Sequence, residues 1–306
     1  MPLVLSDPPV PADWGRHSAA SDPGECAALL AAVPPKVEDI GATARNLIAH
    51  YRAQAADLPD GTRDDVHLRW LADQLATDQR RHPYPLGVAR PVEERLQGCC
   101  RDHTLFAVAV LRQHGVPARS RVGFADYFSP DWHNDHVVPE YWEGNRWRRF
   151  DPEIESAGPL IPDPLDLEIG DQAPFCTAAQ VFALMRSGGI DPASYGVTSG
   201  SPFSGEQFVV GEVFYEVAHR YGDEVLLWDG WGALPDPDRP VEGGVLTLLD
   251  EVTDLLLAAD AGDVQAEARL YSRYLSDGRL SPGDTVTRFS PFGDAPVQVT
   301  LRLSER

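Results

Sequence analysis

The stretch Gly98-Cys99-Cys100-Arg101-Asp102-His103 leads into an apolar segment that ends at His114-Gly115-Val116-Pro117. Residues 105–111 are aliphatic or aromatic at every position, and a glycine followed closely by a proline is a common helix stop. The pattern predicts a buried central helix over residues 101–114. Cys100 then lies where a loop enters the N-terminus of this helix. The unpaired amides and the helix dipole there are expected to lower the pKa of its thiol and make it more nucleophilic.

Three stretches after this helix have the residue pattern of strands, at 118–124, 136–142 and 146–151. A helix followed by an antiparallel sheet predicts an α+β fold.

The last two strands are expected to form a hairpin that brings a histidine and an aspartate together. A tight turn centred on Glu143-Gly144 sets a register in which His136 lies directly opposite Asp151. Opposed Cβ atoms lie about 4.5–5.5 Å apart, so this carboxylate can accept a hydrogen bond from the imidazole. Cys100, His136 and Asp151 are therefore the candidate catalytic residues.

The order of these motifs along the chain resembles that of the transglutaminase-like superfamily. The resemblance covers about residues 95–155 and rests on Gly98-x-Cys100-x-Asp102, Gly115-Val116-Pro117-Ala118-Arg119, His136 and Asp151-Pro152. It implies a papain-like core in which a central helix packs on an antiparallel sheet and the two carry a Cys-His-Asp triad. Cys100 rather than Cys99 is then the nucleophile, because it lies two residues after Gly98 and two before Asp102.

The same resemblance implies the chemistry. An enzyme of this type acts on an amide or peptide through a thioester on Cys100, with His136 as the base and Asp151 orienting it. Water as the acceptor gives an amidase-like or protease-like hydrolase, an amine gives a transglutaminase-like acyltransferase, and the sequence leaves both open. The chemistry requires no cofactor. His103 and Val137 depart from the family, which often has aromatic residues at these positions, and this leaves the substrate specificity open.

Away from this core, we expect an N-terminal arm over residues 1–35, a catalytic core over 36–155, and a Pro-rich connection with a mostly helical C-terminal region over 156–306. Periodic apolar residues predict helices at 37–56, 63–81, 178–185, 207–221 and 244–274, and the alternating tail 296–303 predicts a strand.

The composition limits the partners and the location. The 306 residues include 47 Asp and Glu against 26 Lys and Arg, a net charge of -21, and contain no basic stripe. We therefore expect neither nucleic acid nor a membrane as a partner, which leaves the peptide or small amide substrate. The chain start has no features of a secretory signal, no apolar run could cross a bilayer, and four cysteines make no disulfide framework. These features predict a soluble cytoplasmic protein.

Two other interpretations stay open. The chain could be a transglutaminase-like binding scaffold that has lost activity, or it could hold zinc through Cys100, His103, His133 and His136. Two tryptophans are weaker candidates for lining a substrate groove, Trp132 and Trp142.

Overall fold

The computed structural model describes residues 3–170, 173–236 and 239–301, which combine helices and sheets. The central sheet has the strand order β5-β4-β3-β6 with antiparallel neighbours, and a short strand β7 joins β4 in parallel. The strands are β3 (Ala118–Ser129), β4 (Trp132–Trp142), β5 (Trp147–Arg149), β6 (Phe175–Thr177) and β7 (Tyr195–Gly196).

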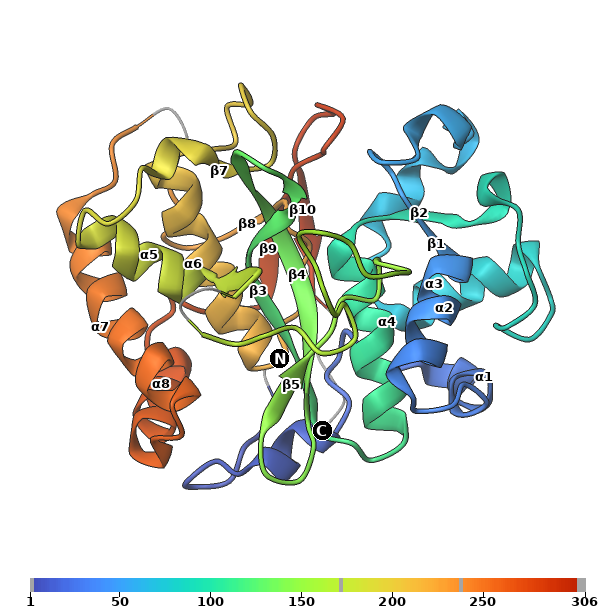
Figure 1. Cartoon of the computed structure of the whole chain (residues 1–306), viewed down its shortest axis with the longest axis horizontal. Coiled ribbons are helices and arrows are strands. Elements are labelled where there is room, and N and C mark those ends of the chain that lie inside the picture. The colour runs from blue at the N-terminus through green and yellow to red at the C-terminus, as the bar shows by residue number, and fades with distance from the viewer. Residues whose placement is uncertain (1–2, 171–172, 237–238, 302–306) are drawn as a thin grey trace.

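Figure 1 shows this sheet between two groups of helices, one from each half of the chain. On one side lie α1 (Ala27–Ala31), α2 (Val37–Leu47), α3 (Leu71–Arg81) and α4 (Cys100–Gln113), with α4 packed on β4 and β3. On the other lie α5 (Ala178–Arg186), α6 (Glu206–Arg220), α7 (Gly243–Asp260) and α8 (Val264–Ser276), with α6 packed on β3.

The smaller elements connect these layers. Short 3-10 helices are η1 (Pro11–Gly15), η2 (Gly24–Cys26), η3 (Ala55–Asp57), η4 (Asp60–His67), η5 (Val92–Glu94) and η6 (Pro192–Ser194). Strands β1 (Ile48–His50) and β2 (Leu96–Gly98) form a parallel pair, and β8 (Asp229–Gly230), β9 (Thr285–Arg288) and β10 (Val297–Thr300) form a second antiparallel sheet. In the described part of the chain, no helix is both long and apolar enough to cross a bilayer.

The predicted central helix is confirmed as α4. It is apolar on every face because it lies between the sheet and the N-terminal helices, and its residues up to Arg112 are buried. It ends where Gly115 adopts a positive φ of 73° and the N–H of Val116 bonds back to the carbonyl of Leu111. A hydrogen bond of 2.8 Å from the Thr104 hydroxyl to the carbonyl of Val137 fixes the helix against β4.

Three of the predicted helices are shorter or interrupted. The segment 37–56 leaves the helix after Leu47 and continues as β1, and 244–274 is divided at Gly262, whose φ is +94°. The segment 63–81 breaks between η4 and α3, where Arg69 forms a buried ion pair of 2.5 Å with Asp229. The two residues are far apart in the sequence, so the periodicity of apolar residues does not indicate this break in the helix. Of the predicted tail strand, 297–300 is confirmed as β10, and residues 302–303 lie outside the described residues.

Buried arginines join the sheet to the C-terminal helices. Arg121 of β3 lies 2.7 Å from Glu216 of α6 and 2.6 Å from Asp260 at the end of α7. Glu140 of β4 lies within 3.1 Å of three guanidinium groups, those of Arg119, Arg121 and Arg149. Burial raises the pKa of Glu140, but the three arginines lower it more, so the net shift is downward.

We expect Glu140→Gln to lower the free energy of unfolding by about 3–5 kcal/mol, because three buried guanidinium groups then share one fewer negative charge. Urea denaturation measures this loss. Glu143→Gln is the matched control, since Glu143 is exposed and its ion pair with Arg148 lies at the surface, where removing it costs about 1 kcal/mol or less. Equal losses in the two variants would contradict the structural role of Glu140.

Candidate active site

The turn before α4 explains why glycine and aspartate flank the cysteines. The carboxylate of Asp102 accepts a hydrogen bond of 2.9 Å from the N–H of Cys99, which closes the turn and starts the helix at Cys100. A Cβ on Gly98 would lie 2.9 Å from this carboxylate and 2.8 Å from the side chain of Ile48. The Gly-x-Cys-x-Asp pattern is therefore the local requirement for presenting Cys100 as the first residue of a buried helix.

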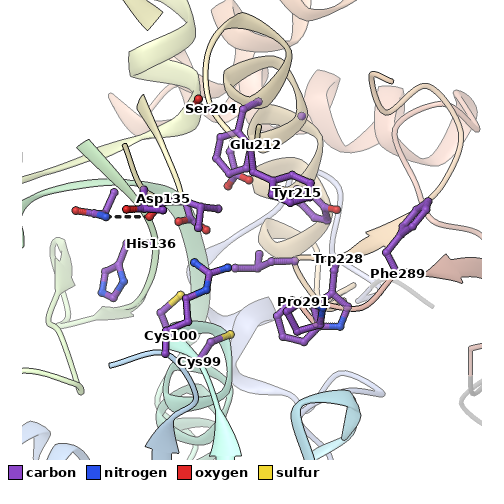
Figure 2. Close-up of a pocket in the computed structure, with 18 of the residues that line it drawn as sticks. Cys99, Cys100, Asp135, His136, Ser204, Glu212, Tyr215, Trp228, Phe289 and Pro291 are labelled. Carbon is purple, nitrogen blue, oxygen red and sulfur yellow. Dashed lines mark hydrogen bonds between the residues drawn. The ribbon is translucent and has the colours of Figure 1, made fainter. Parts of the chain in front are cut away.

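His136 and Asp151 form a buried pair. Nε2 of His136 lies 2.8 Å from Oδ2 of Asp151, so its Nδ1 is the ring nitrogen left for the thiol. The hydroxyl of Tyr127 donates a bond of 2.7 Å to the same carboxylate oxygen, and the N–H of Glu153 donates one of 2.8 Å to the other. Figure 2 shows His136 and Cys100 at the same end of one pocket. The structure thus brings together the three residues that the sequence singled out.

The hairpin register differs from the one predicted. The turn is centred on Gly144-Asn145, where Gly144 has a φ of +84° and the N–H of Glu143 bonds to the carbonyl of Arg146. Trp142 therefore pairs with Trp147, and Asp151 follows the end of β5 instead of lying directly opposite His136. The displacement is two residues, and because side chains alternate with a period of two, the carboxylate still reaches His136.

The predicted lowering of the Cys100 pKa is wrong. A hydrogen bond with the thiol of Cys99, burial, and nearby negative groups raise the pKa of Cys100 well above its ordinary value. Only 4% of Cys100 is exposed, and a local residue pattern does not report how deeply a single thiol is buried. Burial lowers the pKa of His136, but Asp151, Glu153 and Asp135 raise it more, so its net shift is upward.

An ion pair at the start of α4 was not predicted from the sequence. Oε1 of Glu153 lies 2.8 Å from Nδ1 of His103, which also lies 3.0 Å from the carbonyl oxygen of Cys99. Burial raises the pKa of Glu153, but His103, His50 and His136 lower it more. Two features of the sequence could have indicated the pair: His103 replaces a residue that is often aromatic, and Glu153 directly follows Asp151-Pro152.

A cavity of about 650 Å³ opens beside the two cysteines and His136. Its far wall comes from the C-terminal half of the chain, and Figure 2 shows the labelled side chains that reach it from α6, from the segment around Trp228 and from the loop after β9. The Phe, Tyr and Trp side chains of the lining are Tyr51, Phe128, Phe203, Phe208, Tyr215, Trp228 and Phe289.

Neither tryptophan proposed for the substrate groove lines this cavity. Trp132 donates its indole N–H to the carbonyl of Gly196 at 3.0 Å, and Trp142 packs edge-on against Trp147 with ring centroids 5.5 Å apart. Both side chains therefore have contacts within the fold.

The side chains considered as zinc ligands have other partners in the structure. His103 pairs with Glu153, while His133 lies 2.5 Å from Asp126 and stacks on the ring of Tyr195 at 4.0 Å. Among the residues that the structure describes, no group of three or more His, Cys, Asp or Glu has an arrangement that could hold a metal ion. The geometry gives the zinc interpretation no support.

Comparison with known proteins agrees with the motifs. Residues 52–152 match the model of the transglutaminase-like superfamily, so this part of the chain is a transglutaminase-like domain. A solved structure that matches is that of a candidate cysteine protease from Cytophaga hutchinsonii, at 16% identity and a TM-score of 0.32. The match covers 54% of this chain and 45% of that one, so it spans less than half of that protein. No curated protein matches the chain.

Proposed function

We propose that this protein is a thiol enzyme that transfers the acyl group of an amide or peptide through a thioester on Cys100. The observation that carries the proposal is the buried pair of His136 and Asp151, joined at 2.8 Å, beside a cysteine that starts a buried helix and lines a 650 Å³ cavity. A free thiol, a base and a carboxylate that orients the base are the parts that acyl transfer requires.

The steps follow from the available atoms. Nδ1 of His136 takes the proton of the Cys100 thiol as the sulfur attacks the carbonyl carbon. The N–H of Cys100 is one of the helix-terminal amides without an intrahelical partner, and it can donate to the oxygen that becomes negative. His136 then returns the proton to the departing amine, and the carbon–nitrogen bond breaks to leave the thioester. Attack by water or an amine, with loss of a proton to His136, releases the product and restores the thiol.

Product analysis tests the proposal. The purified protein is incubated with a pool of amide-containing peptides, with and without an added amine, and the products are sequenced by mass spectrometry. Cleaved or deamidated peptides identify a hydrolase, and peptides that carry the amine identify a transferase. A protein with no effect on any peptide, but with a folded pocket that binds them, would instead be a scaffold.

We further propose a reducing cytoplasmic location, supported by four free cysteines, and a division into an arm (1–35), a catalytic core (36–155) and a C-terminal region (156–306). The cavity draws its lining from the last two parts, so the C-terminal region contributes to substrate recognition.

The rate should depend on pH in a direction set by His136. The pKa of His136 is raised above its ordinary value of 6.5. The neutral imidazole that accepts the thiol proton therefore becomes the main form only when the pH exceeds this raised pKa. We expect kcat/KM to rise with pH and the midpoint of this rise to lie above 6.5. A pH profile of kcat/KM measures it, and a midpoint near 5 would contradict His136 as the base.

A further inference from the structure

Apart from Glu153, which pairs with His103, two carboxyl groups in the cavity have no part in the proposed chemistry. Asp135 precedes His136 on β4, and Glu212 lies on α6, and both line the cavity together with Cys100. Figure 2 shows the Glu212 side chain extending from its helix toward the side of the cavity where Asp135 lies.

Glu212 is buried without a counter-charge. Only 3% of the residue is exposed, and in the described structure its Oε2 atom is buried and makes no hydrogen bond. A buried carboxyl oxygen without a partner is costly, and a ligand that donates to it removes this cost. Burial, then the negative charges of Asp135 and Glu216, raise the pKa of Glu212 well above its ordinary value. All three effects disfavour the charged form of Glu212, and a cation bound beside it would favour that form.

Asp135 faces the same cavity and is only partly compensated. Burial raises the pKa of Asp135, while the cationic Arg52 and the neighbouring His136 oppose the shift. Arg52 also lines the cavity, but it is exposed to solvent.

The remaining lining indicates what kind of cation fits. Phe208, Tyr215, Trp228, Leu234 and Phe289 line the same cavity as the two carboxyl groups and give it apolar and aromatic surface. A hydrated metal ion gains little from such walls, and two carboxyl groups are too few to replace its water. An ammonium group on an aromatic or aliphatic body matches both the carboxyl groups and the apolar walls. The charge pairs with the carboxylates, and aromatic faces attract cations.

We propose that Asp135 and Glu212 bind an ammonium group of the substrate on which Cys100 acts, and that the aromatic wall binds the apolar body attached to it. The site rests on the proposed function for its role in turnover, whereas the binding itself does not require the thiol. The ammonium group belongs either to the amine that accepts the acyl group or to the acyl donor.

Calorimetry on the Cys100→Ala protein measures binding at this site in the absence of turnover. The probes are a series of primary amines from butylamine to phenethylamine and tyramine, each compared with the alcohol of the same shape. We expect at least one amine to bind at least tenfold more tightly than its alcohol. Adding Glu212→Gln or Asp135→Asn should weaken that amine about tenfold or more and leave the alcohol unchanged. Equal affinities for amines and alcohols, or no binding of any amine at 10 mM, would overturn the proposal.

Two controls separate recognition from folding. Asp254→Asn changes an exposed carboxylate on α7 outside the cavity lining, and we expect it to leave amine affinity unchanged. Glu212→Gln keeps the size of the side chain and removes a buried ionisable group, so its thermal midpoint should equal or exceed that of the parent. A folded Glu212→Gln protein that binds the amine as tightly as the parent contradicts the proposal.

The active enzyme then identifies the source of the ammonium group. If the group belongs to the acceptor, it first gives one proton to the carboxylate pair, because only the neutral amine attacks the thioester, and it gives a second proton to His136 as the amide forms; the amine then appears in the product. If the group belongs to the acyl donor, the amine competes with the donor and stays unchanged. Amine binding without any thioester would support the ammonium site and refute the acyl-transfer proposal. A thioester without selectivity for amines would support acyl transfer and refute the ammonium site.

Discussion

Cys100→Ala is expected to abolish turnover of amide substrates, with a loss of roughly 10⁴-fold or more, while the protein remains folded. Alanine removes the thiol that we propose to react with the help of the His136–Asp151 pair. It also suits the first turn of a helix, so α4 should be retained. Initial rates on a substrate identified from the peptide pool measure the loss, and circular dichroism checks the fold.

Cys99→Ala is the matched control, because it removes the adjacent thiol. Cys99 and Cys100 are both 4% exposed, and the hydrogen bond with Cys99 is the largest cause of the raised pKa of Cys100. Without that bond the Cys100 thiol should ionise more easily, so turnover should persist or increase. Loss of turnover in Cys99→Ala with full turnover in Cys100→Ala would exchange the roles of the two cysteines.

Asp151→Asn has the second-largest expected effect, a fall in kcat of roughly 10²–10⁴-fold with measurable activity remaining. The amide fills the same space but cannot stabilise the imidazolium or hold the productive tautomer. Because Asp151 helps to raise the pKa of His136, the rise of kcat/KM with pH should also move to lower pH in this variant. A purely structural aspartate would leave the pH profile in place.

Tyr127→Phe is the milder companion change. It removes one hydrogen bond to Asp151 but leaves the carboxylate and its contact with His136, so a loss in rate of only a few-fold is expected.

If Asp151→Asn retained the full rate of the parent, another acid would have to orient the histidine, and Asp135 of the same cavity is the nearest alternative in sequence.

The sequence predicted the parts of the site that depend on local patterns. The central helix could be read because an all-apolar segment is bounded by a capped turn and by Gly115. The contact between His136 and Asp151 was predicted correctly although the predicted turn was wrong. A displacement of two residues keeps a side chain on the same face of a strand.

The rest of the site depends on contacts between distant parts of the chain. Glu212 and Trp228 lie more than a hundred residues after Cys100, and nothing in their local pattern indicates that they line its cavity. The pKa of Cys100 likewise depends on its burial and on the thiol of Cys99, so its position at a helix N-terminus suggested the wrong direction. Periodicity locates elements, whereas cavities and desolvation follow from their packing.

Trapping the covalent intermediate shows whether Cys100 is the nucleophile. The protein is mixed with an activated acyl ester, quenched in acid within seconds, and analysed by intact-mass and peptide-mapping mass spectrometry. We expect one acyl group on Cys100, released by hydroxylamine as thioesters are, and no acyl group on the Cys100→Ala protein. An acyl group on Cys99, or steady turnover with no acylated cysteine at any time, would contradict this expectation.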